Sequence, residues 1–254
     1  MTIADQLKQA KADLDNVYQA GWLAGDFEGY SRGHGEGYTA GYEEGKNAGG
    51  GGGDSYYDTF WDEVQVGGTR TDYNYGFCHS TWTDTIFKPK YPMKPSNVYY
   101  MFTQSAITTL KDIDIDFSNV SSSGLVRPFD GSAIKYIGVI DISHLASPNI
   151  NTLFAGASKL ETVELFKVSD AGTVTFSTNT FQNCSALANI NFGGLLNSDI
   201  NMSACPLTTA SLQSIIDHMA TAATQRTLTL SATAKANLTA EQNAAVTAKN
   251  WKIA

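Results

Sequence analysis

From residue 102 onward, apolar residues recur along the chain with a long period and a short one. Four phenylalanines lie 27, 25 and 27 residues apart, each has a small residue three positions later, and an alternating apolar stretch follows. Alternation with a period of two is typical of β-strands, so the pattern predicts one strand per repeat. The phenylalanines are Phe102, Phe129, Phe154 and Phe181, and the predicted strands carry Ile113 and Ile115, Val139 and Ile142, Val163 and Leu165, and Ile190 and Phe192.

A unit of 25–27 residues cannot bury its own apolar face, so neighbouring units must stack. The pattern therefore predicts about four irregular leucine-rich repeats over 101–205, forming an α/β solenoid with a parallel sheet on one side. The four phenylalanines would form a ladder in its core, with Leu160 and Leu187 as further core positions. Cys184 stands at the small position of its repeat, and we interpret it as a packed core thiol rather than a nucleophile.

The segment before the repeats, residues 54–100, is predicted to close their N-terminal end. It begins with a short helix over 55–65 that Asp54 or Ser55 can cap, and continues with aromatic residues and three prolines. We interpret the segment as an aromatic cap. The alternative is an exposed sugar-binding surface, since tyrosine and tryptophan faces suit sugar rings.

The segment after the repeats, residues 206–254, is predicted to close the other end. A solenoid needs an end piece with a polar face, and four elements of this segment supply one. Thr208 or Thr209 can cap the first of them. In order, the predicted elements are a helix over 210–224, a strand at Leu228 and Leu230, a helix that begins after Thr239, and a strand over 251–254.

The first 48 residues carry a different pattern, which predicts a helical oligomerisation stalk. Apolar residues from Ile3 to Val17 alternate spacings of four and three, as in the a and d positions of a coiled coil. Glycine then recurs at every fourth position from Gly21 to Gly49. Such a stripe lets helix backbones approach closely, and its period predicts right-handed winding. The residues expected at the helix interface are Leu7, Leu14, Gly21, Gly25, Gly29, Gly33, Gly37, Gly41 and Gly45.

A flexible linker studded with tyrosines is the alternative for the glycine-rich stretch, because each glycine costs a helix about 1 kcal/mol relative to alanine. The strict register favours the helix, since a linker has no reason to repeat every fourth residue. The run of glycines over 49–53 predicts a hinge after the helix.

The charge and composition exclude several classes of partner. A formal net charge of −8 offers no basic stripe for nucleic acid and disfavours an anionic membrane surface. We find no apolar run of about 18 residues that would span a membrane, and the charged N-terminus does not resemble a signal peptide. The three cysteines, Cys78, Cys184 and Cys205, fit free buried thiols better than a disulfide framework or a zinc site.

Residues with obvious chemistry are sparse. Asp112, Asp114 and Asp116 alternate, so they would share one strand face; a calcium site is conceivable there, and we prefer a solvated face. The four histidines show no metal-binding spacing, and no nucleophile-elbow, zincin or P-loop motif occurs. We therefore predict no catalytic residues, no metal and no cofactor, and a protein that is not an enzyme.

The stretch FQNCSALANINF at Phe181–Phe192 resembles the BspA-like leucine-rich repeats of bacterial surface proteins. The wider order of features is similar to leucine-rich-repeat structural proteins encoded by phages and prophages of gut bacteria. That order comprises the glycine-rich start, YYDTFWDEVQ, GTRTDYNYGF, the irregular repeats and the tail from residue 207. No catalytic residues come with this resemblance.

The resemblance implies a phage virion appendage, such as a tail fibre, tail tip, baseplate protein or capsid spike, that presents a repeat head for attachment to the host surface. It implies a protein made in the host cytoplasm and assembled into the virion. Its partners would be copies of itself joined through the N-terminal helix, with a trimer favoured, other virion proteins, and a host cell-surface glycan or protein. A non-binding assembly or decoration protein is one alternative. A bacterial surface adhesin is another, which the absent signal peptide disfavours.

Overall fold

The computed structural model describes residues 71–84, 87–89 and 91–254. The chain divides into two compact units, Met1–Asp62 and Glu63–Ala254, and every described residue belongs to the second. The predicted stalk, the glycine hinge and the first helix of the aromatic segment lie outside the described residues. So do all the residues expected at the helix interface, which are Leu7, Leu14, Gly21, Gly25, Gly29, Gly33, Gly37, Gly41 and Gly45.

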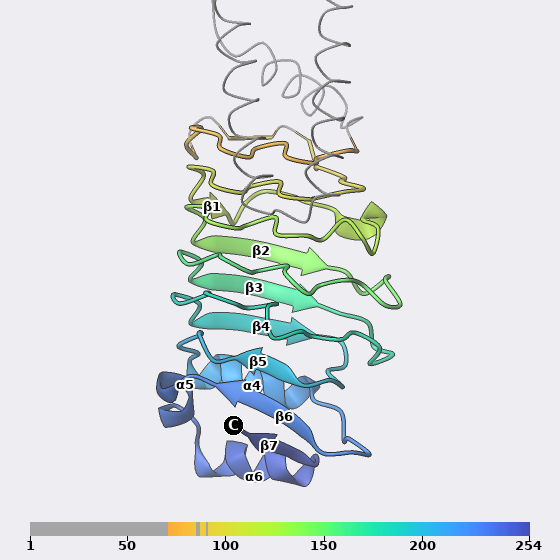
Figure 1. The fold of residues 1–254 in the computed structure, drawn as a ribbon, viewed down its shortest axis with the longest axis vertical. Coiled ribbons are helices and arrows are strands. Elements are labelled where there is room, and N and C mark those ends of the chain that lie inside the picture. The colour runs from red at the N-terminus through yellow and green to blue at the C-terminus, as the bar shows by residue number, and fades with distance from the viewer. Residues whose placement is uncertain (1–70, 85–86, 90) are drawn as a thin grey trace, which may run out of the picture. The chain divides into compact units, whose positions relative to one another are not determined.

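The described part of the chain is a mixed α/β fold with two small parallel sheets and a few short helices (Figure 1). In the first sheet the strands lie side by side in chain order, and every pair is parallel. The chain must therefore make one full circuit between one strand and the next, and we call each circuit a coil. The strands are β1 (Thr109–Leu110), β2 (Tyr136–Asp141), β3 (Thr162–Lys167) and β4 (Asn189–Gly193).

The strand register aligns equivalent apolar residues of successive coils. Leu110 pairs with Ile137, Ile137 with Val163, and Val163 with Ile190. All four side chains are buried. They follow the phenylalanine of their coil by eight residues in the first two coils and by nine in the last two. The apolar residues of the strand come one residue earlier in the first two coils, because the segment between the phenylalanine and the strand is one residue shorter.

The strand predicted through Ile113 and Ile115 is wrong. β1 ends before them at Leu110, where its pairing with β2 stops. A 3-10 helix, η1 (Phe117–Asn119), follows. The carboxylate of Asp116 caps it by accepting a hydrogen bond from the backbone N–H of Ser118. The local capping interaction therefore outweighs the alternating pattern in this stretch.

The inward positions of β2 and β3 also differ from the simple alternation. Val139, predicted as an apolar position of its strand, is 50% exposed, whereas Ile137 and Ile140 on either side are buried. In β3, Leu165 is half-buried and Phe166 is fully buried. The pairing of β3 with β4 shifts register just before Phe166. This irregularity moves the buried position by one residue.

Stacked phenylalanine rings run through the core of the coils. Phe102, Phe129, Phe154 and Phe181 stack in order with centroid distances of 6.1, 6.1 and 5.2 Å. Phe77, which falls in the segment predicted as an aromatic cap, stacks on Phe102 at 5.2 Å. All five side chains are buried. We call these five residues the phenylalanine ladder, and it begins one coil earlier than the four repeats read from the sequence.

The same corner turn recurs at each rung of the phenylalanine ladder. The backbone N–H three residues after the ring donates to the ring residue's carbonyl, as from Ser105 to Phe102 at 3.1 Å and from Cys184 to Phe181 at 3.3 Å. The residue two positions after each ring has a positive φ, a conformation that glycine adopts without strain. Only two coils use glycine there, so the conformation repeats although the residue does not. The five residues are His79, Gln104, Gly131, Gly156 and Asn183.

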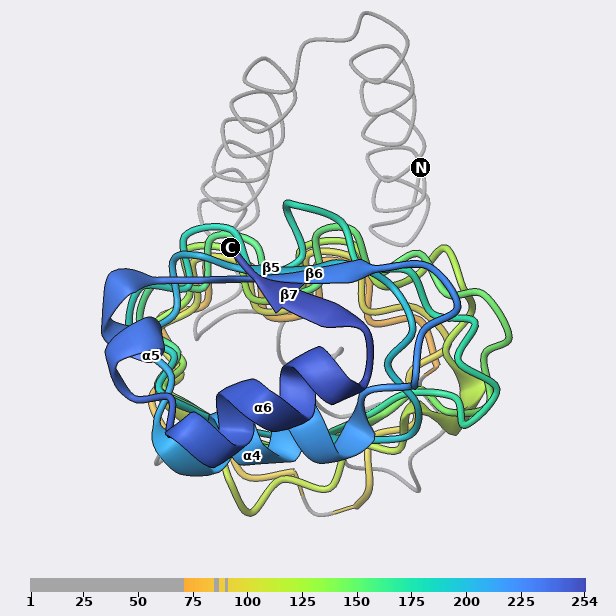
Figure 2. The ribbon, with the colours of Figure 1, turned by 90° about the horizontal axis from the view of Figure 1, so that it is seen from below.

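A second parallel sheet and three helices make up the described chain after β4. Seen along the stack of coils, β5, β6 and β7 lie along one side and α4 and α6 along the opposite side (Figure 2). The strands are β5 (Ile200–Met202), β6 (Arg226–Leu230) and β7 (Trp251–Ile253), and the helices are α4 (Thr209–His218), α5 (Ala232–Ala236) and α6 (Ala240–Ala248). Thr208, Ser231 and Thr239 cap the three helices. The sequence pattern predicted neither α5 nor β5.

Two serine side chains of α4 end the first sheet at β4. The hydroxyl of Ser211 accepts a hydrogen bond from the backbone N–H of Ile190 at 2.9 Å and donates to the carbonyl of Ala188 at 3.1 Å. The hydroxyl of Ser214 accepts from the N–H of Phe192 at 2.8 Å. A further strand would otherwise bind these N–H groups, so the helix closes an edge that could pair with another chain.

Replacing Ser211 by alanine is expected to destabilise the fold by about 1–3 kcal/mol, because it leaves the buried N–H of Ile190 without a partner. The measurement is urea unfolding of the full-length chain, compared with Ser203→Ala at an exposed serine. A Ser211→Ala variant within about 0.5 kcal/mol of that control would show that the hydroxyl does not close the sheet edge.

Candidate functional site

A row of polar side chains crosses the outer face of the first sheet, one from each coil. The hydroxyl of Tyr136 donates to Oε2 of Glu164 at 2.9 Å, and Nδ2 of Asn191 donates to the main-chain carbonyl of Glu164 at 2.9 Å. Nζ of Lys111 lies 5.7 Å from the centre of the Tyr136 ring, within the range of a cation–π interaction. We call these four residues the outer row. It offers an ammonium group, an aromatic ring, a carboxylate and an amide to a partner.

Two groups in and beside the outer row, Tyr136 and Asp141, have pKa values that are shifted away from neutral pH. The hydrogen bond to Glu164 raises the pKa of Tyr136, because it stabilises the protonated hydroxyl. Nearby, Nζ of Lys167 lies 3.2 Å from Oδ2 of Asp141. Burial alone would raise the pKa of Asp141, but hydrogen bonds from Ser143 and Lys167 bring it below its usual value.

A small apolar strip lies beside the outer row. Val139, on β2, is half exposed and pairs with Leu165 of β3. On β4, a Cβ atom added to Gly193 would lie 3.1 Å from Cγ of Lys167 and 3.5 Å from Cδ1 of Leu165. The two side chains therefore lie over the glycine. The sheet thus presents C–H surface next to hydrogen-bonding groups.

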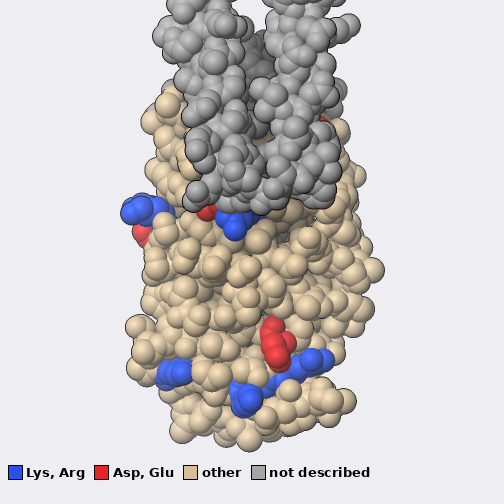
Figure 3. Space-filling view, in the orientation of Figure 1, with Lys and Arg blue, Asp and Glu red and all other residues tan. Residues whose placement is uncertain are grey.

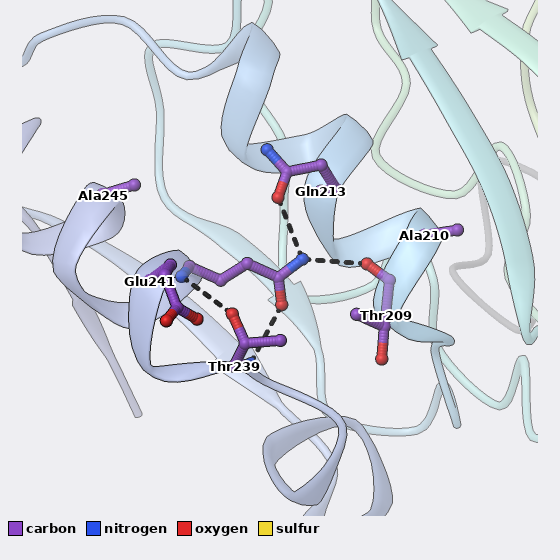
Figure 4. Close-up of a pocket in the computed structure, with 7 residues that line it drawn as sticks. Thr209, Ala210, Gln213, Thr239, Glu241 and Ala245 are labelled. Atoms are coloured by element: carbon purple, nitrogen blue, oxygen red, sulfur yellow. Dashed lines mark hydrogen bonds between the residues drawn. The ribbon is translucent and has the colours of Figure 1, made fainter.

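A hollow of about 650 Å³ lies between α4 and α6 (Figure 4). Gln242 bridges the two helices there: its Nε2 donates to the carbonyl of Thr209 at 3.0 Å and to Oε1 of Gln213 at 3.1 Å. Oε1 of Gln242 accepts from the N–H of Thr239 at 3.1 Å, as part of the capping box of α6. The amide is fully used within the fold, so we interpret the hollow as a packing seam between two helices.

The residues predicted for the repeat core lie in the interior. Leu160 and Leu187 are buried beside the phenylalanine ladder, and Cys184 donates through its Sγ to the carbonyl of Phe154 at 3.0 Å. The hydrogen bond with Cys205, together with burial, raises the pKa of Cys184, and burial raises the pKa of Cys78 to about 12. All three cysteines are free, buried thiols. The raised pKa values hold Cys78 and Cys184 as thiols at neutral pH, so these two are poor nucleophiles.

The aspartates considered as a calcium site do not share a strand face, because no strand forms between Leu110 and β2. One carboxylate oxygen of Asp116 accepts the hydrogen bond that caps η1. Among the described residues, no three His, Cys, Asp or Glu side chains are grouped as metal ligands.

Charged side chains are sparse and scattered on the face of the described residues that Figure 3 shows. Most of the visible surface there belongs to uncharged residues, and lysines and arginines form separate spots instead of a continuous stripe. No helix in the described part of the chain is long and apolar enough to cross a bilayer. The visible face therefore lacks the electrostatic pattern that nucleic-acid binding needs.

The outer row was not predicted from the sequence, although its residues recur at a regular spacing. Tyr136, Glu164 and Asn191 are separated by 28 and 27 residues, close to the repeat length. Polar residues that recur at the repeat period on the strands share one exposed face of the sheet. A search for polar as well as apolar residues at that period would have named them as candidates, although only the strand register shows that they form one row.

No family model matches the chain, and the comparisons with curated proteins and with solved structures find no match. A function for this chain can therefore be proposed only from the geometry of the described residues and from the resemblance of the repeat sequence. That geometry offers one feature suited to an external partner, which is the outer row with its apolar strip.

Proposed function

We propose that this chain is a phage virion appendage in which a leucine-rich-repeat solenoid head attaches to the host cell surface. In this proposal residues 1–48 form the helical stalk of a homo-oligomer, with a trimer favoured, and anchor the head to other virion proteins. The head is a binding module without catalytic activity. Several heads on one particle would turn weak single contacts into useful avidity.

The spacing of interactions between coils supports the repeat architecture of this proposal. Hydrogen bonds from side chains reach carbonyls one repeat away again and again through the described residues. Examples are Thr103 to Arg127, Ser177 to Asn151 and Asn191 to Glu164, separated by 24, 26 and 27 residues. A stack in which each unit touches its neighbours is the arrangement that solenoid proteins use.

The observation that carries the attachment function is the outer row on the exposed face of the first sheet. Glu164 is held by the hydroxyl of Tyr136, and the amide of Asn191 is fixed on the next strand. Rigid strands thus hold several hydrogen-bonding groups beside the exposed Val139. A saccharide presents hydroxyls at its edge and C–H groups on its face, so a cell-surface glycan is the partner whose chemistry fits best.

Binding of the full-length chain to bacterial envelope polysaccharides and to a glycan array tests this function. We expect at least one saccharide to bind. The double substitution Tyr136→Ala with Asn191→Ala should weaken that binding by about tenfold or more, since it removes the ring and the amide together. Asn243→Ala, at an exposed position of α6, is the control and should bind as the unsubstituted chain does.

Absence of binding to any saccharide or envelope preparation would reject the attachment function and favour a non-binding assembly or decoration protein. Binding that survives the double substitution would place the contact elsewhere on the head. Circular dichroism of each variant establishes that the fold is kept before binding is compared.

A further inference from the structure

Two of the buried cysteines occupy equivalent corner positions of neighbouring coils. The N–H of Cys184 donates to the carbonyl of Phe181 at 3.3 Å, and the N–H of Cys205 donates to the carbonyl of Met202 at 3.0 Å. Both are thus the third residue after the start of the same corner turn. A backbone bond of 2.9 Å from Thr208 to the carbonyl of Ala188 sets the register between the two coils, with a shift close to the 21 residues that separate the cysteines.

This register brings the two thiols together. Both side chains are 0% exposed, and the neighbouring Cys205 thiol is the main cause that raises the pKa of Cys184. Adjacent coils of a parallel stack lie about 4.8 Å apart, inside the range of Cα separations of about 4.4–6.8 Å that disulfides span. Cys78 lies four coils away, beside Phe77 at the far end of the phenylalanine ladder, and is out of reach.

We propose that Cys184 and Cys205 form a disulfide under oxidising conditions, which joins the last coil of the first sheet to the C-terminal helices and second sheet. The bond closes a loop that contains β4 and β5. It constrains the unfolded chain and adds a second covalent link, besides the backbone, between two neighbouring coils.

The chemistry needs an oxidant, and a small-molecule disulfide supplies it. One cysteine thiolate attacks a sulfur of oxidised glutathione and releases one glutathione thiolate, leaving a mixed disulfide. The second cysteine thiolate attacks the protein sulfur of that mixed disulfide and releases the second glutathione. The two protein thiols lose two protons and two electrons, and the glutathione disulfide is reduced to two thiols. Because both cysteines are fully buried in the fold, the exchange proceeds during folding or local opening.

Refolding the reduced full-length chain in a glutathione redox buffer, followed by blocking of free thiols in denaturant and tryptic digestion, tests the proposal. The tryptic peptide over 168–226 contains both cysteines, and the peptide over 71–90 contains Cys78. We expect the first peptide to carry no blocking group and to weigh two hydrogens less than its reduced form. The second peptide should carry one blocking group and so serves as an internal control.

The oxidised chain should also unfold at a midpoint roughly 5–10 °C above that of the reduced chain. In Cys205→Ser, Cys184 should be blocked completely and the two conditions should give the same midpoint. The proposal fails if the 168–226 peptide carries two blocking groups after oxidative refolding, or if Cys78 is linked to either partner. It also fails if the Cys184–Cys205 bond forms but lowers the midpoint, because the native coils would then not accommodate it.

Discussion

Replacing Phe154 by alanine is expected to destabilise the protein by about 3–5 kcal/mol, the range for deleting a fully buried aromatic side chain. Phe154 is 0% exposed and lies inside the phenylalanine ladder. Its ring stacks on Phe129 at 6.1 Å and on Phe181 at 5.2 Å, and meets the edge of Phe166 at 5.3 Å. The substitution therefore leaves a cavity that three aromatic neighbours line.

Urea unfolding of the full-length chain, followed by tryptophan fluorescence, measures this effect. Leu195→Ala is a suitable control, because Leu195 is a large apolar side chain that is 36% exposed, and its loss should cost less than about 1 kcal/mol. Equal losses for the two variants would mean that the phenylalanine ladder contributes no more than surface apolar contacts do.

The second large effect is expected at Gly194, where any side chain meets backbone. Gly194 has a φ of +84°, and a Cβ atom there would lie 2.0 Å from the carbonyl oxygen of Val168. The chain leaves β4 at this point and passes close to the preceding coil. Gly194→Ala should destabilise the protein by about 3–5 kcal/mol, from left-handed backbone strain together with displacement of the neighbouring coil.

The adjacent glycine provides a matched control for this prediction. A Cβ atom on Gly193 would meet side chains and not backbone: Cγ of Lys167 at 3.1 Å and Cδ1 of Leu165 at 3.5 Å, so a shift of Lys167 by a few tenths of an ångström relieves the contact. Gly193→Ala should therefore cost less than about 1 kcal/mol. The measurement is the thermal unfolding midpoint of each variant. A Gly194→Ala protein as stable as Gly193→Ala would show that the close approach to Val168 is absent.

The repeat organisation of the strands was accessible from the sequence because burial imposes a period on the side chains. The apolar positions Ile137, Val163 and Ile190 align across β2, β3 and β4 in the structure. The helices after Thr208 and Thr239 likewise begin at the residues whose side chains cap them. Capping and apolar periodicity involve residues that are close in the chain, so both can be predicted from the sequence.

The coil at Phe77 was not predicted from the sequence pattern. The residues around it are aromatic and rich in tyrosine, so the coil reads as a cap instead of a repeat. Its place becomes visible only through stacking on Phe102 at 5.2 Å and through the positive φ of His79. The repeating feature is a backbone conformation, which glycine adopts without strain and which histidine, glutamine and asparagine adopt at some cost.

The candidate site was even less accessible to sequence reasoning than the core. Tyr136, Glu164 and Asn191 are ordinary surface residues in the sequence, and only the register of three strands places them in one row. The exposed position of Val139 likewise depends on the local pairing of β2. Register is set by contacts with neighbouring coils, and a shift by one residue would turn these side chains to the other face.

The sequence pattern was sufficient to predict that phenylalanines recurring every 25–27 residues fill the interior and that strands follow Phe129, Phe154 and Phe181. It also predicted C-terminal helices that begin after Thr208 or Thr209 and after Thr239. The extra rung at Phe77, the closure of the sheet edge by Ser211 and the proximity of Cys184 and Cys205 became evident only in the folded chain. The difference comes from the range of the interactions. Burial and capping act on residues close in the chain, whereas stacking, edge closure and thiol contact join residues about one repeat apart, whose alignment exists only once the coils have formed.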